Sequence, residues 1–94
     1  METKDKILAY KYFQPKEKLV LYIIQDECVD VEPFSYPCRL RTNEIGLRIG
    51  LSRKDVLDCI WGLLENDLIE TNVENYSRDT KLSKRCLRLI NKKD

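Results

Sequence analysis

The sequence predicts an α+β fold, with three core helices followed by a C-terminal β-hairpin, and three patterns support this prediction. Apolar residues recur at helical spacing between residues 15 and 27. Two more helical patterns lie between residues 42 and 65, where Gly50 separates them. From Leu68 onward "LIETNV" alternates in polarity, and "RCLRLI" returns to the same strand-like pattern after a polar stretch.

The first core helix should run from about Pro15 to Glu27, because proline favours an early helical position. The preceding residues, 1–14, are predicted to be an N-terminal arm, and residues 15–94 a single domain. After the helix, Pro33 and Pro37 rule out further helix and favour an extended loop. The next four residues, "CRLR", then fit a short strand.

The second and third helices are predicted from their end signals. Thr42 is a candidate N-cap for a helix over residues 43–49, which Gly50 would end. Ser52, with Asp55 three residues later, resembles a capping box that opens the third helix. The buried stripe of that helix would be Val56, Ile60, Leu63 and Leu64. Two helices joined by a short Gly-containing turn form a helix-turn-helix, which leaves the N-terminus of its second helix exposed.

The stretch "TNEIGLRIGLSRKDVLDCIWGLLENDLIE" resembles the winged helix-turn-helix superfamily. The positions that carry the resemblance are Thr42, Ile45, Gly50, Leu51, Ser52, Arg53, Val56, Ile60, Leu63, Leu68 and Ile69. Asp67 departs from the family, which prefers glycine there, but aspartate tolerates left-handed backbone. "PKEKLVLYIIQDE" and "YPCRLRTNEI" are also similar to winged-helix domains of plasmid and phage replication proteins. The resemblance implies a DNA-binding domain with a β-hairpin wing.

Length and motifs argue against an enzyme. A chain of 94 residues has room for a modest core but not for a large cleft between layers. It has no histidine, no Gly-rich phosphate loop and no G-x-S-x-G motif, so we expect no catalytic residue and no cofactor. Acidic residues cluster near the end of the third helix, where solvation explains them: Glu65, Asp67, Glu70 and Glu74.

The cysteine spacing argues against a bound metal, and the lengths of the apolar runs argue against a membrane partner. Cys28, Cys38, Cys59 and Cys86 never approach a C-x2-C spacing, so we expect reduced cysteines and no metal site. The longest apolar run, residues 19–24, is far shorter than the roughly 20 residues of a membrane-spanning helix. No secretory signal opens the chain, and we therefore expect a cytoplasmic protein without a membrane partner.

Charge is unevenly distributed although the net charge is only +1. Residues 78–93 hold seven basic residues against Asp79, whereas residues 55–75 hold six acidic residues and no basic one. A local basic patch attracts nucleic acid even in a nearly neutral protein. The alternative for such a C-terminal segment is a solvated tail without a ligand.

Sequence-specific binding of double-stranded DNA is the first functional hypothesis. Ser52, Arg53 and Lys54 open the third helix, where backbone N–H groups and cationic side chains face a phosphate or a base edge. Asp58, further along, would accept a hydrogen bond from a cytosine amino group. The hairpin should hold basic residues against phosphates. The predicted DNA-binding residues are Arg41, Asn43, Ser52, Arg53, Lys54, Asp58, Arg78, Lys81, Lys84 and Arg85.

A protein-interaction module in a larger assembly is the second hypothesis. Leu57 and Trp61 lie four residues apart and would form an apolar ridge on the third helix. This ridge is either covered by the chain itself or binds another protein. Tyr10 and Tyr12 make the arm aromatic, so it packs either onto its own domain or onto a second copy in a homodimer.

Overall fold

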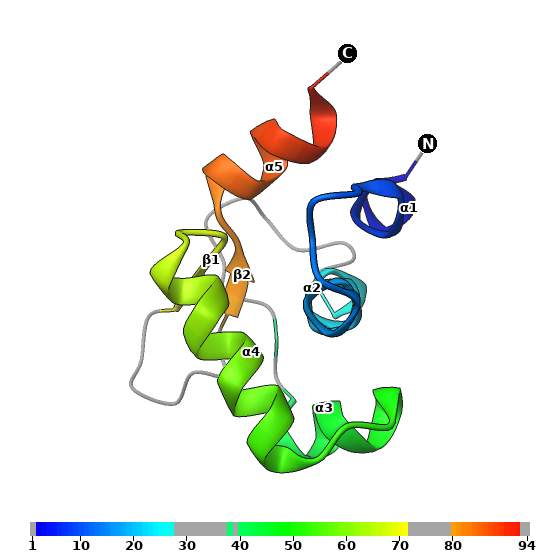
Figure 1. Cartoon of the computed structure of the whole chain (residues 1–94), viewed down its shortest axis with the longest axis vertical. Coiled ribbons are helices and arrows are strands. Elements are labelled where there is room, and N and C mark those ends of the chain that lie inside the picture. The colour runs from blue at the N-terminus through cyan, green and yellow to red at the C-terminus, as the bar shows by residue number, and fades with distance from the viewer. Residues whose placement is uncertain (1, 28–37, 39, 72–79, 93–94) are drawn as a thin grey trace.

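The computed structural model describes residues 2–27, 38, 40–71 and 80–92 (Figure 1). These residues form, in chain order, α1 (Thr3–Ala9), α2 (Pro15–Asp26), α3 (Thr42–Ile49), α4 (Arg53–Glu65), β1 (Ile69–Thr71), β2 (Thr80–Leu82) and α5 (Lys84–Asn91). The radius of gyration, 12.1 Å, matches the roughly 12 Å expected for a compact domain of this length. The predicted α+β class is confirmed at this level.

Helix α2 is the element around which the others pack. It begins at Pro15 as predicted, and Glu17 Oε1 accepts a 2.9 Å hydrogen bond from the backbone N–H of Gln14, the residue before the helix. Its buried residues, Val20, Leu21, Ile23 and Ile24, recur at helical spacing. Helices α1, α3 and α4 and strand β2 all contact α2, so it occupies the middle of the fold.

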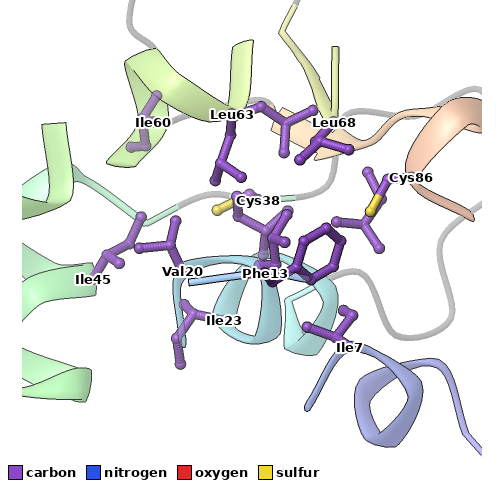
Figure 2. Close-up of a cluster of buried hydrophobic side chains, with 14 of the residues drawn as sticks. Ile7, Phe13, Val20, Ile23, Cys38, Ile45, Ile60, Leu63, Leu68 and Cys86 are labelled. Carbon is purple, nitrogen blue, oxygen red and sulfur yellow. The ribbon is translucent and has the colours of Figure 1, made fainter. Parts of the chain in front are cut away.

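A single hydrophobic core joins all the helices (Figure 2). In the close-up, Ile7 approaches from α1, Ile45 from α3, and Leu63 from α4. All three side chains are fully buried, and burying an aliphatic side chain of this size stabilises a fold by about 1.5–3 kcal/mol. Because this core draws on α1 and α5 as well as on the three predicted helices, the terminal helices are part of the packed structure.

Helix α1 lies within the segment predicted to be an arm, residues 1–14. Ile7 from α1 is fully buried, and Phe13, in the connection to α2, is only 7% exposed. Leu8 and Tyr12, by contrast, remain exposed. The buried pair packs into the core that α2 centres, so this part of the chain folds back onto its own domain.

Three helices are also linked by charged side chains around Asp26, at the end of α2. Lys4 Nζ lies 3.0 Å from Asp26 Oδ1, and Arg48 Nη2 lies 2.8 Å from Asp26 Oδ2. Arg48 Nη1 also donates a 2.7 Å hydrogen bond to Glu27 Oε1. The hydrogen bonds from Lys4 and Arg48 hold the pKa of the Asp26 carboxyl below its ordinary value. Pairs this close to solvent add little stability, but they fix how α1, α2 and α3 meet.

Within the described residues, the hairpin consists of β1 and β2, with three residues each. Strands β1 and β2 are antiparallel, with Ile69 opposite Leu82 and Thr71 opposite Thr80. Asp67, just before β1, adopts the predicted left-handed backbone with φ 58°. The predicted strand "CRLR" is wrong for the residues described, because neither Cys38 nor Leu40 is in a strand. The Cys38 backbone N–H still donates a 3.2 Å hydrogen bond to the Thr80 carbonyl, which joins this segment to β2.

The prediction of a strand at "RCLRLI" is wrong, because these residues form helix α5. Ser83 caps the helix: its Oγ accepts a 3.0 Å hydrogen bond from the Cys86 N–H. Cys86 and Ile90, four residues apart, are buried, while Arg85 and Arg88 are exposed. Apolar residues at 86, 87, 89 and 90 fit a helical repeat as well as an alternating one. The helix is favoured over a strand because Ser83 caps it and because Cys86 and Ile90 bury one side of it in the core.

Candidate nucleic-acid interface

The turn between α3 and α4 positions the exposed start of α4. Gly50 ends α3 in left-handed backbone, with φ 74°, as predicted. The Leu51 N–H donates a 2.9 Å hydrogen bond to the Gly46 carbonyl, and the chain then leads directly into α4. A Cβ atom at Gly46 would lie 2.3 Å from the Leu51 carbonyl oxygen. The turn therefore requires glycine at position 46 for close approach, a requirement that the sequence prediction missed.

The residue before each of these helices was predicted with mixed success. Ser52 is the N-cap of α4, and its Oγ accepts a 3.1 Å hydrogen bond from the Asp55 N–H. Thr42 is not the N-cap of α3: it is already helical, its side chain is buried, and Arg41 precedes the helix without a side-chain cap. Because Thr42 already has helical backbone, it is the first residue of the helix, and the N-cap position falls to Arg41, which has no side-chain oxygen to accept the free N–H groups.

Two cations stand at the first turn of α4. Arg53 and Lys54 are exposed, and neither makes an ion pair or a side-chain hydrogen bond within the described part of the chain. The Asp55 carboxylate in the same turn lies 3.7 Å from Lys16 Nζ, so this lysine of α2 partly offsets the negative charge of Asp55. The free N–H groups of the helix start and the two cations together favour a negatively charged ligand.

The predicted residues at the start of α3 are not at this turn. Arg41 and Asn43 are exposed at the beginning of α3. That helix has 8 residues, so its start lies about 12 Å along its axis from Gly50. Arg48 is also a cation close to the turn in the sequence. Its guanidinium forms ion pairs with Asp26 and Glu27.

The rest of the exposed stripe on α4 is not basic. Lys54, Asp58, Trp61 and Glu65 follow one another at helical spacing, and all four are exposed. Leu57 is half-buried, whereas Trp61 is 49% exposed. The stripe therefore changes from positive to acidic and aromatic within about three turns of helix. A polyanion would meet attraction at the first turn and repulsion beyond it.

The basic residues assigned to the hairpin are placed differently in the structure. Lys81 lies in β2 directly opposite Glu70, and its Nζ is 3.8 Å from Glu70 Oε2. It belongs to the sheet, not to a loop, because the second strand begins at Thr80. Arg78 falls outside the described residues, as does the rest of the connection between the strands.

Lys84 and Arg85 belong to α5, which corrects their assignment to the hairpin. Arg85 Nη1 donates a 2.8 Å hydrogen bond to the Asn66 carbonyl at the far end of α4. Helix α4 has 13 residues, so its two ends are about 20 Å apart. The predicted DNA-binding residues thus divide between opposite ends of α4, with Arg53 and Lys54 at one end and Arg85 at the other.

The aromatic residues of the N-terminal segment lie at that second end of the molecule. Tyr10 is half-buried, with its ring centroid 4.4 Å from that of Phe13, and it meets Tyr12 edge-on at 5.5 Å. Tyr12 is 72% exposed. Together with Lys6, Lys11 and Lys92, these tyrosines line a groove of about 450 Å³ between α1 and α5.

The cysteines in the described residues are free thiols. Cys38 and Cys86 are buried, and burial raises the pKa of the Cys86 thiol to about 11. Cys59 is half-buried beside Asp55 and Asp58, and desolvation also raises its pKa. No cluster of three or more potential metal ligands occurs in the part of the chain that is described. Cys38 and Cys86 belong to the hydrophobic core, and Cys59 packs against it.

Comparison with known proteins found no matching family model, no similar curated protein and no similar solved structure. Within residues 2–27, 38, 40–71 and 80–92, no helix has the length and apolar character to cross a membrane. Function is therefore inferred from the arrangement of this chain's own side chains.

Proposed function

We propose that the chain is a winged helix-turn-helix domain that binds double-stranded DNA in a sequence-specific manner, with the first turn of α4 in the major groove. The observation that carries this proposal is the pair Arg53 and Lys54, exposed and without ionic partners among the described residues at a helix start. The order of elements supports it as well: two helices joined by a tight turn precede an antiparallel hairpin. Such a protein would act in the cytoplasm, in transcriptional control or in replicon maintenance.

Arg53 and Lys54 would carry different parts of the contact. An arginine at the start of a helix in the major groove reaches the O6 and N7 atoms of guanine with two parallel hydrogen bonds. Lysine presents a single ammonium group, which suits either a guanine edge or a phosphate. Ser52 already accepts the Asp55 N–H, so its role is to hold the helix start in place.

The acidic residues of the α4 stripe would limit how much of the helix enters the groove. Asp58 is one turn beyond Lys54, and a carboxylate there is repelled by phosphates unless it accepts a hydrogen bond from a cytosine amino group. Glu65 lies two further turns along. The proposed contact is therefore short, and its specificity comes from few base pairs. Arg41 and Asn43 would touch flanking backbone.

Selection from random duplexes, followed by titration of the selected site, tests this proposal. Arg53→Ala should reduce the free energy of binding to the selected duplex by about 1–3 kcal/mol. It should weaken binding to random duplex much less, because a base contact is lost only on the selected sequence. Lys92→Ala is the matched control: it removes one positive charge from the groove between α1 and α5 and should leave the ratio of specific to random affinity unchanged.

Two outcomes contradict the proposal. One is the absence of any duplex bound more tightly than about 100 μM at moderate salt. The other is an Arg53→Ala variant that keeps the wild-type ratio of specific to random affinity. In the second case the duplex is held by general electrostatics, and α4 does not read bases.

A second candidate function is protein interaction through Trp61, favoured by its 49% exposed indole beside the half-buried Leu57. Tryptophan in a partly desolvated position is a frequent anchor of interfaces. Trp61→Ala should then abolish a self-association or partner complex detected by sedimentation while leaving the unfolding midpoint nearly unchanged. Loss of selected-duplex affinity in the same variant, with no change in assembly, would instead assign Trp61 to the DNA contact.

A further inference from the structure

The end of the molecule opposite the start of α4 carries its own basic surface. Arg88, in the last turn of α5, and Lys92, the residue that follows the helix, are both exposed. Neither makes an ion pair with a described residue. The sequence from 80 to 92 contains no acidic residue that would offset them. Helix α5 is therefore apolar toward the core and cationic toward solvent.

A groove continues this basic surface onto α1. Figure 1 shows α1 and α5 at the same end of the molecule, away from α3. The groove between them measures about 450 Å³ and takes Lys6 and Lys11 from the N-terminal segment and Lys92 from the end of α5. No carboxylate from the described residues lines it. Lys6 Nζ donates a hydrogen bond to Asn91 Oδ1, which ties the two walls together and holds one ammonium group at the groove.

Tyr12 provides an aromatic surface at the same place. Its ring is 72% exposed but is supported from behind, because it meets Tyr10 edge-on and Tyr10 packs against the buried Phe13. Lys11 Nζ lies 5.1 Å from the centre of the Tyr12 ring. When a flat ring stacks on Tyr12, the Lys11 ammonium group would either move off the tyrosine ring or lie beside the stacked ring. A single exposed tyrosine is ordinary on a protein surface; a supported one inside a groove with three lysines is a specific combination.

We propose that this α1–α5 groove binds single-stranded nucleic acid, with Lys6, Lys11 and Lys92 at the phosphates and one base stacked on Tyr12. Cationic grooves with aromatic platforms are the general means by which proteins hold single strands. A duplex keeps its bases paired and stacked inside, so the Tyr12 ring has no base face to meet there. The groove volume lies within the range of about 300–1,000 Å³ that accommodates ligands of nucleotide size. The site is separate from the proposed duplex contact at α4 and does not depend on it.

The test is fluorescence anisotropy with a labelled oligothymidine of about 12 nucleotides, within the site sizes seen for single-strand binders. Tyr12→Ala should weaken binding roughly 5- to 150-fold, the affinity that stacking of one base is worth. Tyr12→Phe should restore the wild-type affinity, because it keeps the ring. Lys92→Ala should weaken binding and flatten the salt dependence by about 0.7 units. Arg53→Ala is the matched control and should bind the oligomer as the wild type does.

An abasic oligomer of equal length separates stacking from charge. The wild type should bind it more weakly than oligothymidine, and Tyr12→Ala should lose no further affinity on it. Equal affinity of wild type and Tyr12→Ala for oligothymidine, or equal affinity of the wild type for abasic and thymidine strands, overturns the proposal and leaves only a general polyanion surface.

Nuclear magnetic resonance identifies the surface independently of affinity. Addition of the thymidine oligomer should shift the amide resonances of residues 6–12 and 88–92, and should leave those of residues 53–55 in place. Shifts confined to residues 53–55 would overturn the α1–α5 site and assign single-strand binding to α4. Because the oligomer and the duplex address opposite ends of the molecule, failure of one proposal is distinguishable from failure of the other.

Discussion

The two basic surfaces of this protein, at the first turn of α4 and in the α1–α5 groove, are built in different ways. Arg53 and Lys54 follow a tight turn and a capping serine, all within a few residues of one another. Lys11 and Lys92, which share the groove, are separated by most of the chain and meet only because both terminal helices pack on the core. One surface thus depends on local backbone geometry and the other on tertiary packing. Variants that damage each kind of support should separate the two.

The largest expected effect is on the support of the groove. Ile7→Ala removes a fully buried side chain that joins α1 to the core, and it should lower the free energy of unfolding by about 2–5 kcal/mol. Leu8→Ala, at the neighbouring but 44% exposed position, is the control and should change stability by less than about 0.5 kcal/mol. Urea unfolding measures both. Equal, small effects would mean that α1 is a loosely attached arm.

The next effect concerns the turn before α4. Gly46→Ala places a Cβ atom 2.3 Å from the Leu51 carbonyl oxygen, so the turn must shift, with a loss of roughly 1–3 kcal/mol. Gly62→Ala, in the middle of α4, is the matched control, because a Cβ atom added there would meet no atom within 4 Å. It should stabilise the protein by up to about 1 kcal/mol through helix propensity. Two changes of the same sign in thermal unfolding would contradict this account of the turn.

The capping serines should differ by a smaller amount. Ser83 is buried, and its Oγ both accepts from the Cys86 N–H and donates a 2.6 Å hydrogen bond to the Asp67 carbonyl. Ser52 is exposed, and the hydrogen bond of its Oγ among the described residues is with the Asp55 N–H. Ser83→Ala should therefore lower stability by about 1–3 kcal/mol and Ser52→Ala by about 1 kcal/mol. Chemical denaturation of both variants checks the order, and a larger loss for Ser52→Ala would reverse it.

The smallest effect is the pH dependence of the charges that join α1, α2 and α3. Because Lys4 and Arg48 depress the pKa of Asp26 in the folded protein, Asp26 stabilises the fold above its unfolded pKa of about 3.9. That contribution disappears as the pH falls through the lower, folded pKa. Asp26→Asn should thus be less stable than wild type near neutral pH and equal to it in strong acid.

Added salt should reduce this difference at neutral pH, since the groups are close to solvent. Asp5→Asn is the control, because Asp5 is an exposed carboxylate without an ion pair among the described residues. Near neutral pH, Asp5→Asn should change the free energy of unfolding less than Asp26→Asn does. A difference for Asp26→Asn that persists in acid would assign the effect to packing at the end of α2.

Helices α2, α3 and α4 were predictable because their signals are local. Pro15 opens α2, Gly50 ends α3 and Ser52 caps α4 where the sequence predicts. Asp67 adopts the left-handed backbone expected of it, for the same reason. The start of α3 was predicted one residue too late, at Asn43 instead of Thr42, since a helix start with neighbouring polar residues offers more than one possible cap.

The candidate sites were less predictable, because the surroundings of a charge are not local. Position in the sequence identifies Arg53 and Arg48 equally as cations near the turn, yet only Arg48 reaches Asp26 and Glu27. The same is true of Lys81, whose partner Glu70 is brought opposite by strand pairing. The groove at Tyr12 was not predicted at all, since its two walls come from the two ends of the chain.

By itself the sequence determined the start of α2, the end of α3, the start of α4, the turn between α3 and α4, and the cations that open α4. These features depend on backbone preferences and capping over a few residues, which are nearly independent of the rest of the chain. Only the tertiary structure decided that residues 84–91 are a helix, which cations are neutralised, and that α1 and α5 form a common groove. The physical reason is that a short apolar pattern fits more than one repeat, and contact with the core selects among them.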